Sequence, residues 1–131
     1  MTEKKSVLED LYSDSGAFDT KRVVEVLKPI LSIKRGGQEI FFTGEGHSLK
    51  NEDKMLAYCL VKKLLKSEGL VEDAGVSGKE VHEQTEVPKG TVDPAMQKLK
   101  KEGFLAGSGK SYEIPARKVE TILQRLEAYR A

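Results

Sequence analysis

Apolar residues recur along the chain at two spacings, and each spacing predicts one kind of element. Spacings of three and four residues, which place apolar side chains on one face of a helix, alternate with short runs typical of strands. Glycines and prolines separate these segments and mark the turns. In chain order, the pattern predicts a helix over residues 20–27, a hairpin over 30–43, helices over 51–69, 78–85 and 91–102, a hairpin over 104–114 and a last helix from 116.

The first helix and hairpin have recognisable ends. Asp19 or Thr20 can cap the helix, and Pro29 limits it. In the hairpin, two strand-like runs flank Gly36-Gly37, because glycine readily adopts the positive φ angles that a tight turn needs. Residues 43–49 are expected to form a loop. The inward face of the helix is expected to contain Val23, Val24 and Leu27.

The helix that begins at Asn51 is apolar on two sides. Asn51 is a favourable N-cap, and Glu52 and Asp53 place negative charge at the positive end of the helix dipole. Met55 and Cys59 stand among lysines, on the side opposite the main apolar stripe. Because apolar residues occur on both sides, we expect this helix to lie between other elements as a central scaffold. Its main stripe contains Leu56, Ala57, Leu60, Val61 and Leu64.

Residues 78–115 combine two helices and a hairpin in a fixed order. Ser77 can cap the first helix, Pro88 and Gly90 allow the chain to reverse, and Gly103 is a common residue after a helix end. The stretch resembles the winged helix-turn-helix of prokaryotic (archaeal or bacterial) transcription regulators. The positions that carry the resemblance are Val81, Val87, Thr91-Val92, Met96, Leu99 and Gly103-Phe104-Leu105.

The resemblance implies an α+β fold, in which a winged helix occupies residues 50–115. Before it lie a flexible segment over 1–19 and a helix-and-hairpin extension over 20–49, and a C-terminal amphipathic helix follows over 116–131. The implied function is that of a small regulator that binds duplex DNA without catalysis.

In that family the exposed face of the second helix enters the major groove, where side chains can distinguish base pairs. Apolar residues at i, i+4 and i+7 would pin the other face of this helix to the core. Gln97 can pair with adenine, whereas Lys98 and Lys101 can contact guanine or phosphate. The implied DNA-contact residues are Lys89, Thr91, Gln97, Lys98, Lys101 and, at the tip of the wing, Lys110.

Other features of this segment favour a different partner. Asp93 and Pro94 occupy the early exposed turn of the second helix, where base contacts would concentrate, and the helix contains no arginine. The whole chain has 22 Lys and Arg against 21 Asp and Glu, for a formal net charge of +1. Affinity for a polyanion depends on clustered cations rather than on this total. A protein-interaction module built on a winged helix is therefore the alternative.

The run from Gly107 to Ser111, GSGKS, is similar to the end of a phosphate-binding loop. That motif needs a further glycine where this chain has Phe104, and it needs a following helix where this chain has a strand-like run. A hairpin tip explains the glycines better than nucleotide binding does.

Cys59 is followed by three lysines, at positions 62, 63 and 66. Nearby cations lower the pKa of a thiol and could create a redox-sensing group, but an ordinary half-buried cysteine is the simpler alternative. The two histidines, His47 and His82, have no ligand partner at close spacing, and no nucleophile–base pair stands out. We therefore expect no metal, no cofactor and no enzymatic activity.

The last helix has two interpretations. Its apolar residues can dock on the chain's own domain, or they can form a homodimer seam, which presents two recognition helices to neighbouring half-sites. Dimerisation is the favoured interpretation. The stripe contains Val119, Ile122, Leu123, Leu126 and Tyr129.

The sequence also bears on location. No apolar run approaches the length that spans a bilayer, and residues 1–10 are too polar for a signal peptide. A single cysteine excludes an internal disulfide and agrees with a reducing compartment. A cytoplasmic protein without a membrane partner is therefore expected.

Overall fold

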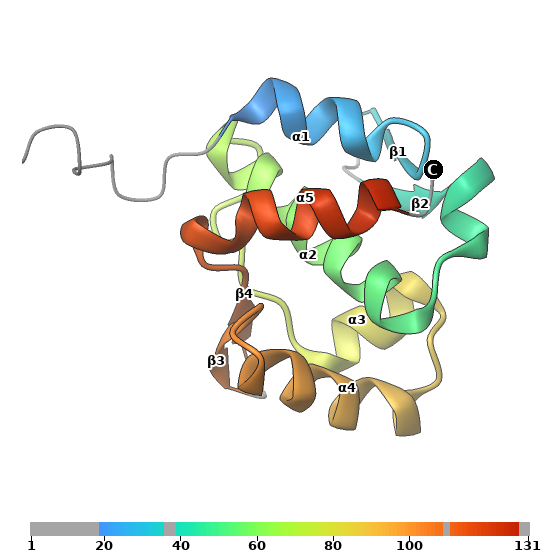
Figure 1. Cartoon of the computed structure of the whole chain (residues 1–131), viewed down its shortest axis with the longest axis vertical. Coiled ribbons are helices and arrows are strands. Elements are labelled where there is room, and N and C mark those ends of the chain that lie inside the picture. The colour runs from blue at the N-terminus through green and yellow to red at the C-terminus, as the bar shows by residue number, and fades with distance from the viewer. Residues whose placement is uncertain (1–18, 36–38, 109–110, 129–131) are drawn as a thin grey trace, which may run out of the picture.

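The computed structural model describes residues 19–35, 39–108 and 111–128 (Figure 1). Within these residues the chain is a mixed α+β structure with five α-helices and two small antiparallel sheets. All but the last residue of the predicted flexible segment (1–19), and the turn at 36–38, lie outside the described residues. The elements are α1 (Thr20–Leu27), β1 (Leu31–Lys34), β2 (Glu39–Phe42), the 3-10 helix η2 (Gly44–Ser48), α2 (Asn51–Ser67), α3 (Gly78–Thr85), α4 (Lys89–Lys101), β3 (Ala106–Ser108), β4 (Ser111–Glu113), the 3-10 helix η3 (Ala116–Lys118) and α5 (Val119–Glu127).

Helix α2 occupies the centre of the fold. In Figure 1, α1 and α5 lie on one side of it and α3 and α4 on the other, and α2 contacts all four helices. Met55 and Cys59 are buried as fully as the main stripe, which confirms the prediction of a helix packed on both sides. The buried side chains of all the helices form one continuous hydrophobic core.

The first helix and hairpin form as the sequence predicts. The Asp19 carboxylate accepts hydrogen bonds from the backbone N–H groups of Lys21 and Arg22, so it caps α1. Strands β1 and β2 pair antiparallel. The prediction of the residues on the inward face of α1 was wrong at one position: Val24 is 48% exposed, whereas Val26 is buried. Buried residues at i, i+3 and i+4 share a face, and Val24 falls just outside that arc.

Two expectations about the start of α2 are wrong. Lys50, not Asn51, is the N-cap, and no side chain bonds to the first turn from that position. Residues 44–48 form η2 rather than a loop. Gly46 explains the close packing here, because a Cβ atom at this position would lie 2.0 Å from the carbonyl oxygen of Ile30. The short helix is therefore pressed against the base of the hairpin.

Helix α5 packs against α1 and α2 within the same chain. Four residues of its predicted dimer stripe, Val119, Ile122, Leu123 and Leu126, are at most 3% exposed and belong to the chain's own core. These side chains are therefore not available to a second copy. Their burial agrees with the other interpretation, in which the helix docks on the chain's own domain. Tyr129, the fifth residue of the stripe, lies outside the described residues.

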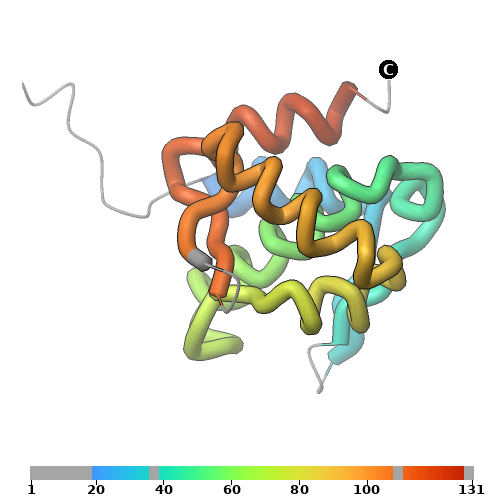
Figure 2. The backbone as a smooth tube through the Cα atoms, turned by 90° about the horizontal axis from the view of Figure 1, so that it is seen from below, coloured from blue at the N-terminus to red at the C-terminus, as the bar shows by residue number. Residues whose placement is uncertain are grey.

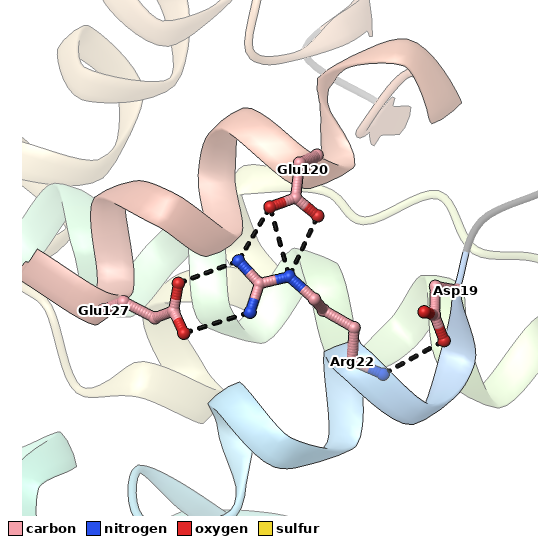
Figure 3. Close-up of polar contacts among 4 residues, drawn as sticks. All are labelled: Asp19, Arg22, Glu120 and Glu127. Carbon is pink, nitrogen blue, oxygen red and sulfur yellow. Dashed lines mark hydrogen bonds and ion pairs between the residues drawn. The ribbon is translucent and has the colours of Figure 1, made fainter.

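An ion-pair cluster fastens α1 to α5 on the surface (Figure 3). The Arg22 guanidinium donates to both oxygens of Glu120 at 2.7–3.1 Å and to both oxygens of Glu127 at 2.8–3.0 Å. Bidentate pairs of this kind fix geometry more than single contacts do. The N-terminal helix is thus held on the outer face of α5. No helix in the described ranges is long and apolar enough to cross a membrane.

Candidate nucleic-acid interface

Helices α3 and α4 form a tight pair whose turn is held by hydrogen bonds. Ser77 caps α3 by accepting from the N–H of Glu80 at 3.0 Å, as the sequence predicts. The Val87 carbonyl can only accept, so His82 Nδ1 carries the proton and donates to it at 2.7 Å. Glu86 adopts a left-handed φ of +63°, which lets α3 stop and the chain reverse. These contacts fix the direction of α4.

Helix α3 is in turn fastened to α2. Glu80 accepts a hydrogen bond from the Tyr58 hydroxyl, and its Oε2 lies 3.1 Å from the Lys62 ammonium. Burial and the bond to Glu80 raise the pKa of Tyr58 above its usual value. The helix pair therefore sits on a rigid base.

Helix α4 begins at Lys89, two residues earlier than predicted, because Pro88 serves as its N-cap. The Pro88 carbonyl accepts from the N–H groups of Thr91 and Val92 at 2.8 and 3.0 Å. The helix ends at Lys101 with Glu102 as its C-cap, and Gly103 follows with a φ of +88°, as predicted for a residue after a helix end. The N–H groups of Gly103 and Phe104 close the last turn by donating to the backbone carbonyl oxygens of Lys100 and Leu99, respectively.

The two faces of α4 differ as predicted. Val92, Met96 and Leu99 are at most 1% exposed and anchor the helix to the core. Figure 2, which views the molecule from below, shows α4 running across the face opposite α1, with α3 alongside. At 100° per residue, the centre of the outer face contains Gly90, Pro94, Gln97 and Lys101, all exposed.

Two charged residues of α4 lie toward its flanks. Asp93 leans toward α3, since its Oδ1 lies 2.6 Å from the place where a Cβ atom would stand at Gly78. Its carboxylate is therefore closer to the neighbouring helix than the sequence suggested. On the other flank, Lys98 Nζ lies 3.1 Å from Glu52 Oε2 at the start of α2.

Glu52 belongs to a charge network that joins α4, α2 and α5. Its other oxygen accepts from Arg125 Nη2 at 3.1 Å, and Arg125 Nε donates to the fully buried Asp53 at 2.6 Å. Burial raises the pKa of Glu52, but hydrogen bonds from Lys98 and Arg125 outweigh that effect and the pKa lies below its usual value. The guanidinium of Arg125 also lies over the Phe104 ring, 5.3 Å from its centre.

The β3–β4 hairpin lies beside the C-terminal end of α4 in Figure 1. A third segment joins it, because Val76 and Tyr112 exchange backbone hydrogen bonds of 2.8 and 2.7 Å. Gly107 has a φ of +116°, and a Cβ atom there would lie 2.0 Å from the Ser111 carbonyl oxygen, so glycine is required. Lys110, the predicted contact residue at the tip, lies outside the described residues.

Strand β4 is also tied to α2. Lys63, one of the three lysines that follow Cys59, is only 8% exposed, and its ammonium lies 3.3 Å from Glu113 Oε2. A buried cation bound to β4 fixes the hairpin against the central helix.

A groove lies next to the α3–α4 turn. Its cavity of about 430 Å³ is bounded by β2, the start of α2 and the C-terminal end of α3. Phe41, 46% exposed, lines it together with polar and charged side chains. The charged and titratable residues of the lining are Glu39, His47, Lys54, Glu83 and Glu86.

Cys59 is shielded from solvent in the folded chain. It is 2% exposed, and burial raises its pKa to about 12, an effect that the nearby Lys62 only partly opposes. At pH 8 we expect alkylation of native Cys59 to be roughly a thousandfold slower than that of a model thiol, from the reduced thiolate fraction alone. Mass spectrometry of the native and urea-unfolded protein, treated with iodoacetamide, measures this. Equal rates in the two states would contradict the burial.

The structure brings together Gln97, Lys98 and Lys101 on α4, with Lys89 and the partly buried Thr91 at its start. It adds Glu52 and Arg125, which the sequence did not single out as neighbours of this face. In the described part of the chain, no three His, Cys, Asp or Glu side chains are grouped so that they could hold a metal ion. The chain was also compared with protein-family models, curated proteins and solved structures, and none of these matches it.

Proposed function

We propose that the chain is a winged-helix protein that binds duplex DNA as a small regulator, without catalysis. The observation that carries the proposal is the helix pair α3–α4, which is locked by its turn and followed by a hairpin on the same side. The bridge between Val76 and Tyr112 supports the same assignment, because it ties the segment before α3 to the hairpin that follows α4. Helix α4 would then lie in the major groove.

The outer face of α4 suits contacts to the DNA backbone better than extensive base recognition. Gln97 and Lys101 stand at its centre and can reach base edges. Gly90 and Pro94 carry no hydrogen-bonding side chain there, so the early turns recognise shape rather than sequence. No acidic residue occupies the first turn, and no side chain caps it, which leaves the helix start favourable for a phosphate beside Lys89. We infer modest sequence discrimination and a strong dependence on salt.

A salt titration of the full chain with a random duplex tests this function. A backbone-dominated interface predicts that log affinity falls linearly with log salt concentration, with a slope of about −0.9 for each phosphate neutralised. Fluorescence anisotropy of a labelled duplex between 20 and 200 mM salt measures the slope. A chain that binds no duplex at 20 mM salt would not be a DNA-binding protein of this kind.

Protein docking is the second candidate, and the groove between β2 and α3 favours it. An exposed aromatic side chain beside a cavity of about 430 Å³ is a common feature of protein-contact surfaces. This surface adjoins the α3–α4 turn, so a partner there would lie close to the N-terminal end of α4, where Lys89 is placed. Absence of duplex binding, together with protection of Phe41 by a protein partner, would support this function instead.

A further inference from the structure

We propose that Glu52 is a positioning residue for Lys98 and lowers the affinity of the interface for phosphate. The inference rests on the proposed DNA binding and names the residue that regulates it. The two side chains come from different helices, and their charged groups lie 3.1 Å apart at the edge of the α4 face.

The two partners differ in freedom. The Lys98 side chain is 58% exposed, so water surrounds most of it and it can move to another acceptor. Glu52 is 26% exposed and accepts from Arg125 through its second oxygen. Arg125 is itself fixed by Asp53 and by the Phe104 ring. The mobile Lys98 ammonium is therefore paired with a Glu52 carboxylate that Arg125 holds in place.

This arrangement changes what Lys98 contributes to DNA binding. To contact a phosphate, Lys98 must leave Glu52, whose negative charge then remains fixed close to the duplex. The attraction gained at the phosphate is offset by the pair that is lost and by repulsion from the carboxylate. Lys98 and Glu52 together present almost no net charge, whereas Lys101 presents a full positive charge.

The variant Glu52→Gln tests the inference, because glutamine keeps the size of the side chain and a carbonyl acceptor for Arg125. We expect tighter duplex binding and a salt slope that is steeper by up to about 0.9, one phosphate contact. That slope makes the gain in affinity roughly threefold larger at 50 mM than at 200 mM salt. Thermal unfolding checks that both proteins are folded.

Three comparisons separate this effect from other causes. Glu25→Gln makes the same charge change on the exposed side of α1 and should leave the slope nearly unchanged. In a Lys98→Met background, Glu52→Gln should have a smaller effect, since the cation that it frees is missing and only the repulsion from the carboxylate is relieved. Independently of any change at Glu52, Lys98→Met should reduce the slope less than Lys101→Met.

The outcomes distinguish the inference from the function beneath it. If the unaltered chain binds no duplex at low salt, the proposed function fails and the inference falls with it. If the chain binds DNA but Glu25→Gln matches Glu52→Gln, or the effect is undiminished in Lys98→Met, only the role of Glu52 is overturned. Equal slope losses for Lys98→Met and Lys101→Met would overturn it as well.

Discussion

Reversing the charge of Lys98 and Lys101 together is expected to weaken duplex binding about a hundredfold at 50 mM salt. A hydrogen bond to a charged group contributes about 1.5 kcal/mol or more, so the lost Lys101 contact alone corresponds to about one decade in affinity. The second decade is expected from repulsion, because Lys98→Glu and Lys101→Glu place two new carboxylates opposite the phosphates. Binding should then depend less steeply on salt. Anisotropy titrations at several salt concentrations measure both quantities.

The matched control reverses two exposed lysines on the opposite side of the molecule. Lys21→Glu and Lys28→Glu change the net charge by the same amount but lie in α1 and at its C-cap, far from α4 in Figure 1. We expect a loss of less than tenfold for this pair, from long-range repulsion only. Similar losses for both pairs would mean that α4 is not the contact surface, and no loss for either would exclude an electrostatic interface.

Replacing Arg125 with methionine is expected to destabilise the fold by about 3–5 kcal/mol. Methionine keeps an apolar stem against Phe104 but removes the cation that lies 2.6 Å from the Asp53 carboxylate. Asp53 is 0% exposed, so its charge would remain in the interior without the charge-assisted hydrogen bond from Arg125. Urea unfolding followed by circular dichroism measures the loss.

Two further variants identify the cause of this loss. Arg22→Met removes a guanidinium from a surface cluster, where water screens the lost pair, and should cost clearly less. Adding Asp53→Asn to Arg125→Met removes the buried negative charge and should recover part of the stability. If the double variant is no more stable than Arg125→Met, the buried charge is not the source of the destabilisation.

The sequence predicted the helices and hairpins well because their signals are local. Asp19 and Ser77 cap helices through bonds to residues two or three positions away, and Gly103 ends α4 through its own φ angle. Errors arose where packing decides between similar local choices. Val24 and Val26 both fit a helical stripe, and the contacts of α1 with α2 and α5 bury only the second.

The sequence could predict which residues of α4 form the candidate site, but not which residues of other elements lie beside them. Helical periodicity separates the buried from the exposed residues of α4, and the structure agrees with that division. The partner of an exposed lysine, by contrast, depends on which element packs alongside. Glu52 lies 46 positions before Lys98, and Val76 pairs with Tyr112 across the length of α3, α4 and β3. No spacing in the sequence encodes such neighbours.

The position of α2 has a consequence for assembly. A chain shortened at Pro115 would lose Ile122, Leu123 and Leu126, the buried side chains by which α5 covers one side of the central helix α2. The apolar surface so exposed would itself promote association, and a shortened protein could form oligomers that the intact chain does not. The oligomeric state of this protein is therefore a property to be measured on the whole chain, because its last helix completes the interior.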